Sequence, residues 1–193
     1  VEQDAQSVIR EITYLSQSTA DMIEWRVDAF RDFTDYNAIR SVFEAVAPLL
    51  GEKLFLYTFR TAHQGGMAQV KAEQLDDLHD LAAESGCVDL VDLEFFEEDR
   101  PLHKIKRLRE MGVSVIASHH DFEQTPSSEV MKMLLEKMCA GGADIVKLAV
   151  MPQNYKDVLN LLDVTAQVQS ASTVTERVTL QQTICREGTA VLT

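Results

Sequence analysis

A chain of 193 residues with 46% apolar content can bury one sizeable hydrophobic core, so a single globular domain is the first expectation. Its 31 acidic and 18 basic residues give a formal net charge of −13, which argues against nucleic acid and anionic membranes as partners. The three cysteines lack disulfide or zinc-site spacing, and no run suits a membrane helix or a signal peptide, so we expect a cytoplasmic protein.

Helical segments alternate along the chain with short runs that are typical of buried strands. The first helical segment covers residues 4–18, and the last covers residues 155–169. Another is expected to begin at Thr125 and Pro126 and to stop at Gly141. This regular alternation predicts a parallel sheet. The expected strands are Met22–Asp28, Lys53–Arg60, Val88–Phe95, Val113–His120 and Asp144–Val150.

Each expected strand becomes polar on one face near its carboxyl end, which favours a closed barrel over an open sheet. In the first strand, for example, Glu24 and Arg26 alternate with apolar residues. An open sheet covered by helices on both faces would be apolar on both, whereas a barrel gathers one face of every strand around one axis. The sequence therefore predicts an α/β fold of the (β/α)8 TIM barrel type.

The barrel is not recognisable in full in this sequence. A helix precedes the first expected strand, and a complete barrel usually needs about 250 residues. We therefore expect a single barrel domain over residues 1–169, in which strand 1 and strands 7 and 8 of the barrel are missing. Residues 170–193 are rich in Thr, Ser, Gln and Val, and they form an atypical C-terminal tail.

Lys147 lies in the middle of an apolar strand, between Val146 and Leu148. A charged ammonium would be poorly solvated there, so burial favours a neutral amine that can act as a nucleophile. The alternative is a lysine whose stem packs in the strand while its charged end reaches a paired carboxylate. The polar faces of the other strands favour the catalytic interpretation.

His120 lies where an expected strand meets its loop, on the inward-facing side and next to Asp121. Imidazole is the side chain best suited to moving protons near neutral pH, so His120 is a candidate proton carrier. Alternatively, the His120 imidazole lies at the end of the strand and only caps backbone groups. His119 points to the opposite face, so the two histidines cannot share one metal ion and we expect no metal site.

Charged side chains of both signs share the inward face of the first three strands. They either form a structural ion network or bind an oxygen-rich anionic small molecule, because guanidinium groups grip carboxylates in a forked geometry. The residues are Glu24, Arg26, Arg60, Asp92 and Glu94.

These residues fall in five segments: Glu24–Asp28, Phe59–Gly66, Asp92–Glu94, Ser118–Pro126 and Asp144–Gln153. In order and spacing across residues 1–169, the segments resemble the type I 3-dehydroquinate dehydratases. The resemblance implies a (β/α)8 barrel, usually a homodimer, that dehydrates 3-dehydroquinate to 3-dehydroshikimate in the shikimate pathway without a metal or an organic cofactor.

The resemblance also implies a role for each site residue. Lys147 would form a Schiff base with the substrate ketone, and His120 would carry protons. Glu94 would orient His120. Glu24, Arg26 and Arg60 match positions that hold the substrate's hydroxyls and carboxylate.

The sequence departs from the family pattern in two places. Gln64 stands where the family often has glutamate before two glycines. The family's carboxylate-clamping arginine loop and its lid are not found in residues 170–193, where Arg177 and Arg186 match no motif. Two other functions therefore stay open: another class I Schiff-base aldolase, which would need a phosphate-binding glycine loop, and an inactive partial barrel that only binds a ligand or partner.

Overall fold

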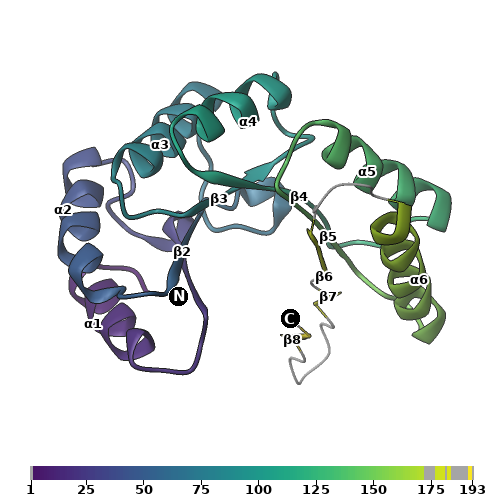
Figure 1. The fold of residues 1–193 in the computed structure, drawn as a ribbon, viewed down its shortest axis with the longest axis horizontal. Helices are drawn as coiled ribbons and strands as arrows, with labels where there is room; N and C mark the ends of the chain where they lie inside the picture. The colour runs from purple at the N-terminus through teal and green to yellow at the C-terminus, as the bar shows by residue number, and fades with distance from the viewer. Residues whose placement is uncertain (1, 172–176, 181, 184–190, 193) are drawn as a thin grey trace. The chain divides into compact units, whose positions relative to one another are not determined.

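The computed structural model describes residues 2–171, 177–180, 182–183 and 191–192, and the chain divides into two compact units. The first unit comprises Val1–Leu93 and Arg107–Ser114, and the second comprises Glu94–Lys106 and Val115–Thr193. In both units strands alternate with helices along the chain, as Figure 1 shows. This order confirms the predicted α/β architecture with parallel strands.

The first unit is built on three strands in the order β1-β2-β3, paired in parallel. Three long helices alternate with these strands along the chain, and short 3-10 turns lie in the connections between helices and strands. The helices are α1 (Ala5–Ser16), α2 (Tyr36–Val46) and α3 (Ala72–Glu84). The strands are β1 (Met22–Arg26), β2 (Leu54–Thr58) and β3 (Leu90–Glu94), of which β3 ends at the division between the units. The turns are η1 (Val27–Ala29), η2 (Ala47–Leu49) and η3 (Ala62–Gln64).

The helices of the first unit pack on the apolar face of its strands (Figure 1). Trp25 of β1 shows how, because its ring meets Phe43 of α2 edge-on at 5.4 Å between centroids and Phe30 at 5.6 Å. Burial of each such ring stabilises the fold by roughly 2–3 kcal/mol. Since neighbouring strand residues point to opposite faces, Glu24 and Arg26 lie on the face away from the helices.

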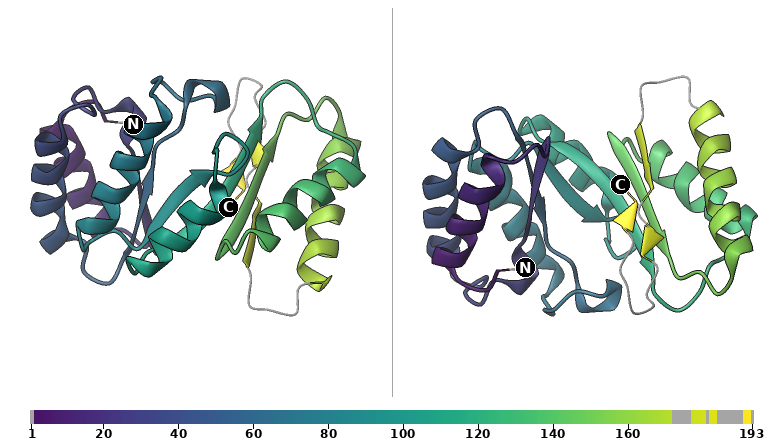
Figure 2. Two further views of the ribbon diagram at one scale, coloured as in Figure 1. Left: turned by 90° about the horizontal axis from the view of Figure 1, so that it is seen from above. Right: turned by 90° about the horizontal axis from the view of Figure 1, so that it is seen from below.

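The second unit repeats the arrangement with strands in the order β4-β5-β6, again parallel. Helices α5 and α6 cover one face of these strands, as both views of Figure 2 show. The helices are α4 (Pro101–Glu110), α5 (Ser128–Ala140) and α6 (Tyr155–Ala171). The strands are β4 (Ser114–Asp121), β5 (Ile145–Val150) and β6 (Arg177–Leu180). Two short strands, β7 (Gln182–Thr183) and β8 (Val191–Leu192), pair in antiparallel fashion. The division between the units crosses α4 and β4.

The bounds of β1–β5 lie within two residues of the strands expected from the sequence. One helix start differs, because Ser127 and not Thr125 is the N-cap of α5. The Thr125 hydroxyl instead donates to the carbonyl oxygen of Met151 at 2.9 Å. The sequence also showed no strand after residue 169, whereas β6 extends the parallel ladder next to β5. Arg186 and Cys185 lie outside the described residues.

None of the helices in the described part of the chain has the length and apolar content needed to cross a bilayer.

Candidate active site

Polar side chains of the first unit gather on the strand face that the helices leave uncovered. Arg26 of β1 is the register partner of Thr58 in β2, which in turn is the partner of Asp92 in β3. The Thr58 hydroxyl donates to Glu24 Oε1 at 2.7 Å. The expected common face of Glu24 and Arg26 is therefore confirmed, and it continues onto the two neighbouring strands.

Arg60, just after β2, is buried against this row of polar residues. Its Nη2 lies 2.9 Å from Asp92 Oδ2, and the two side chains are only 4% and 0% exposed. Attraction between opposite charges is strong where water is excluded, but burying both ions is costly. The pair fixes the position of Arg60, which is what a guanidinium that recognises an anion requires.

Arg26 is held by a second carboxylate, that of Asp28 in η1. Its Nε and Nη2 donate to the two Asp28 oxygens at 2.8 and 2.9 Å. Burial by itself would raise the pKa of Asp28, but the hydrogen bonds from Arg26 and from the backbone N–H of Met67 outweigh it and lower the pKa. Asp28 is therefore ionised over the physiological range.

The second unit contains Lys147, in the middle of β5. Lys147 is 9% exposed, and its neighbours Val146 and Leu148 are 1% exposed. Its register partner in β4 is Ser118, whose side chain is fully buried. Lys147 and Ser118 therefore lie side by side on the same face of adjacent strands.

His120 lies two residues beyond Ser118, so it shares the face of Lys147 and stands one step nearer the carboxyl end of the ladder. Its ring is half-buried and stacks on Phe122 with centroids 6.0 Å apart. His119 points to the other face, where its ring meets Phe96 edge-on at 5.2 Å. Burial lowers the pKa of His119. The opposite placement of the two histidines is as expected from the sequence.

Glu94 joins the same part of the second unit. The backbone N–H of Phe95 donates to the carbonyl oxygen of Ser118 at 3.0 Å, which places residues 94 and 95 alongside β4. The Glu94 side chain is 1% exposed. A buried carboxylate thus belongs to the same unit as the lysine and the histidine.

The loops that follow β4 and β5 are tied to each other, which fixes His120 relative to Lys147. The N–H of Met151 donates to the carbonyl oxygen of Gln124 at 3.2 Å, and Gln153 Nε2 donates to the carbonyl oxygen of Glu123 at 3.2 Å. Within the loop, Asp121 Oδ1 accepts from the N–H groups of residues 123 and 124. These are the segments Ser118–Pro126 and Asp144–Gln153 that the sequence comparison singled out.

The second unit thus offers a buried amine, an imidazole and a carboxylate, which are the groups needed for imine formation with proton transfer. The polar strand face of the first unit offers the guanidinium groups of Arg26 and Arg60, each held by a carboxylate, which suit a ligand with a carboxylate of its own. In the described part of the chain, no three His, Cys, Asp or Glu side chains are arranged to hold a metal ion.

A sequence model of the family described as type I 3-dehydroquinase matches residues 1–182. The chain belongs to this family. The match reaches beyond residue 169, where the motif resemblance ended, and includes β6.

Curated relatives in the type I 3-dehydroquinase family are named 3-dehydroquinate dehydratase. That of Syntrophotalea carbinolica is 40% identical over 159 residues, which make up 82% of this chain and 63% of the relative. That of Salmonella typhimurium is 40% identical over 150 residues, or 77% of this chain and 60% of the relative. The chain therefore spans less than two thirds of the length of these relatives.

Solved structures of the family have the same fold. The type I 3-dehydroquinate dehydratase of Clostridium difficile, solved with covalent modified comenic acid, matches 95% of this chain with a TM-score of 0.89 and 30% identity. The enzyme of Geobacillus kaustophilus matches the same share with a TM-score of 0.89 and 28% identity. These matches cover 72% and 71% of the two solved chains. The predicted TIM-barrel class is confirmed for a chain shorter than its solved relatives.

Several buried polar residues received no role from the sequence, among them Asp28, Ser118 and Gln64. Asp28 and Ser118 lie on the polar faces that alternation had already marked, and this was the available signal. Gln64, the departure from the family pattern, is 1% exposed at the end of η3. Sequence alternation did not reveal its burial because it belongs to a turn and not to a strand.

Proposed function

We propose that this chain is a type I 3-dehydroquinate dehydratase, a lyase that eliminates water from 3-dehydroquinate to give 3-dehydroshikimate. The observation that carries the proposal is the placement of Lys147, which is 9% exposed and lies on the same strand face as His120. Family membership supports it, because the curated relatives carry this activity in their names.

In the proposed reaction the Lys147 amine attacks the C3 ketone of the substrate, and water leaves to form a protonated Schiff base. The imine then draws electrons from the neighbouring C2–H bond as His120 removes that proton. The resulting enamine expels the C1 hydroxyl, which the same imidazolium protonates, so that water departs from the same face. Hydrolysis of the imine releases the product and the free amine.

The proposal assigns the remaining residues to orientation and binding. Glu94 orients His120, and its support is its burial in the same unit. Glu24, Arg26 and Arg60 hold the hydroxyls and the carboxylate of the substrate, supported by the ordered positions that Thr58 and the two aspartates give them. None of these steps calls for a metal or an organic cofactor.

Borohydride trapping with 3-dehydroquinate tests the proposal. The expected result is a reduced adduct of the ligand's mass on Lys147, located by peptide mass spectrometry, and no adduct on Lys147→Met. Lys53, which donates to two carbonyl oxygens outside the candidate site, is the matched lysine and should stay unmodified. Folded protein that forms no adduct would overturn the proposal.

The same assay separates the alternative enzyme class. A class I aldolase would form a reduced adduct with a sugar-phosphate ketone such as dihydroxyacetone phosphate, and it would ignore 3-dehydroquinate. Adducts with both ketones would indicate a reactive amine without the proposed specificity. The known relatives supply the positive control for trapping.

We also propose a cytoplasmic homodimer in which residues 1–169 belong to one barrel domain, which β6 extends beyond the boundary expected from the sequence. The three cysteines lack the spacing of a secreted disulfide framework, which supports the location. Exposed apolar side chains on one face of α6 support self-association, namely Tyr155, Leu159 and Leu162. Light scattering should give a dimer mass for the wild type and a monomer mass for Leu159→Glu.

A further inference from the structure

The Asp28 carboxylate accepts four hydrogen bonds and has no exposed side-chain surface. Its Oδ1 accepts from Arg26 Nε at 2.8 Å and from the backbone N–H of Arg60 at 3.2 Å. Its Oδ2 accepts from Arg26 Nη2 at 2.9 Å and from the backbone N–H of Met67 at 3.0 Å. Each oxygen therefore binds one guanidinium N–H and one backbone N–H.

The forked contact with Asp28 fixes the plane of the Arg26 guanidinium. A guanidinium has five N–H donors, and Arg26 uses two of them in its contact with Asp28. The Arg26 side chain stays 30% exposed, so the group is oriented while it can still reach a ligand. A side chain that is already ordered loses less entropy when it binds.

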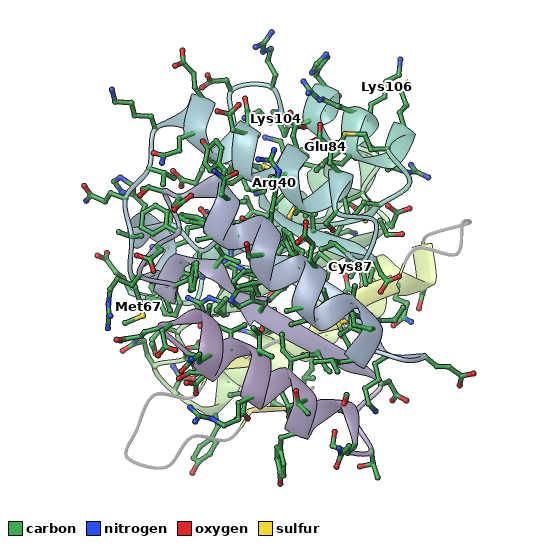
Figure 3. All side chains as sticks on the ribbon, turned by 90° about the vertical axis from the view of Figure 1, so that its left-hand side faces the viewer. Arg40, Met67, Glu84, Cys87, Lys104 and Lys106 are labelled. Atoms are coloured by element: carbon green, nitrogen blue, oxygen red, sulfur yellow. The ribbon has the colours of Figure 1, made fainter. Side chains whose placement is uncertain are left out.

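The two backbone contacts hold the ends of the turn between β2 and α3. Inside this turn the N–H of Gly66 donates to the carbonyl oxygen of Thr61 at 2.8 Å. A Cβ on Gly66 would lie 1.8 Å from the Arg60 carbonyl oxygen, so the turn closes tightly on the residue that carries the second arginine. Met67 contributes only its backbone, because its side chain is 65% exposed and lies at the edge of the molecule in Figure 3.

We propose that Asp28 is the positioning residue for both arginines of the candidate site, orienting Arg26 through its guanidinium and Arg60 through its backbone. This inference rests on the proposed function, because it deepens the role of these arginines in holding an anionic substrate. Asp28 acts on substrate only through them. Removal of its charge should therefore weaken binding of the substrate more than it slows the chemical step.

Asp28→Asn is the test variant, since it keeps the shape of the side chain but turns one acceptor into a donor. The NH2 group of the new amide would replace one carboxylate oxygen and face two N–H donors. At least two of the four contacts would therefore be lost. Two matched controls belong to the same unit. Met67→Ala removes an exposed side chain and keeps the backbone donor. Asp89→Asn removes a carboxylate that accepts from the Phe55 N–H at 2.7 Å and belongs to no guanidinium contact of the described residues.

The first measurement does not depend on turnover. Phenylglyoxal modifies accessible guanidinium groups, and peptide mass spectrometry reports the rate at Arg26 separately from other arginines. We expect Asp28→Asn to raise the Arg26 rate about tenfold, the size of one lost charge-assisted hydrogen bond. Met67→Ala and Asp89→Asn should leave the rate unchanged. Equal rates in wild type and Asp28→Asn would overturn the inference.

The second measurement uses 3-dehydroquinate and a double-mutant cycle. Asp28→Asn should raise KM about tenfold and change kcat less than about threefold. In the Arg26→Ala background, Asp28→Asn should raise KM by much less than tenfold, because the two residues act as one unit. A fully additive cycle would show that Asp28 is merely structural. Absence of turnover and of borohydride trapping in the wild type would defeat the proposed function, and the Arg26 modification rates would still decide the role of Asp28.

Discussion

The buried pair of Arg60 and Asp92 should make Asp92→Ala one of the most destabilising substitutions in the first unit. The 2.9 Å contact joins side chains that are 4% and 0% exposed, so water has little access to the guanidinium that the variant leaves behind. Removing one partner of a buried ion pair costs about 3–5 kcal/mol. The free energy of unfolding of a domain is typically only about 5–15 kcal/mol, so the variant loses a large fraction of its stability.

Urea unfolding followed by circular dichroism measures this loss. With a slope of about 2 kcal/mol per molar urea, the expected change lowers the unfolding midpoint by roughly 1.5–2.5 M. The matched control is Glu136→Ala on α5, whose 3.9 Å pair with Lys132 joins side chains that are 55% and 43% exposed. Loss of that pair should cost less than about 0.5 kcal/mol, because solvent screens exposed charges.

A double variant separates charge burial from packing. Arg60→Met with Asp92→Leu replaces both ions by apolar groups of similar size, so it should be more stable than Asp92→Ala alone. The reasoning is refuted if Asp92→Ala loses less than about 1 kcal/mol, because a buried unpaired charge costs more than an ordinary hydrogen bond. It is also refuted if the double variant is less stable than the single one.

Three further predictions concern chemistry, acidity and the backbone. His120→Ala should keep borohydride-trapped imine but lose at least about 100-fold in kcat, and persistent turnover would mean that another group carries the proton. The lowered pKa of Asp28 contributes stability that is present above the unfolded pKa of about 3.9 and is lost as pH falls through the lower folded pKa. Melting temperatures should therefore fall more steeply below pH 4 in the wild type than in Asp28→Asn, and parallel curves would contradict this. Gly66→Ala forces a Cβ to 1.8 Å from the Arg60 carbonyl oxygen and should lower Tm by about 6–12 °C. Gly51→Ala, with φ +62 but open space, should lower it by only about 2–4 °C.

Much of the fold and of the candidate chemistry follows from local patterns. Strand and helix order comes from periodicity over a few residues, and β1–β5 lie within two residues of their expected bounds. The alternation of side chains along a strand also separates His120 from His119, since neighbouring residues of β4 point to opposite faces of the sheet. The predicted start of α5 was wrong because Thr125 and Ser127 are both good N-caps. In the structure Ser127 accepts from the Val130 N–H, whereas the Thr125 hydroxyl donates to the Met151 carbonyl oxygen.

The sequence by itself determined the α/β class, the polar strand faces and the motif residues of the family, because these depend on neighbours along the chain. The tertiary structure alone decided which residues meet across strands. Ser118 became the partner of Lys147 through the register of β4 and β5, and β6 paired with β5 although no strand was expected after residue 169. The four donors of Asp28 come from three separate places in the chain, so no local pattern could have revealed them. Register and loop closure join distant segments, and periodicity carries no information about either.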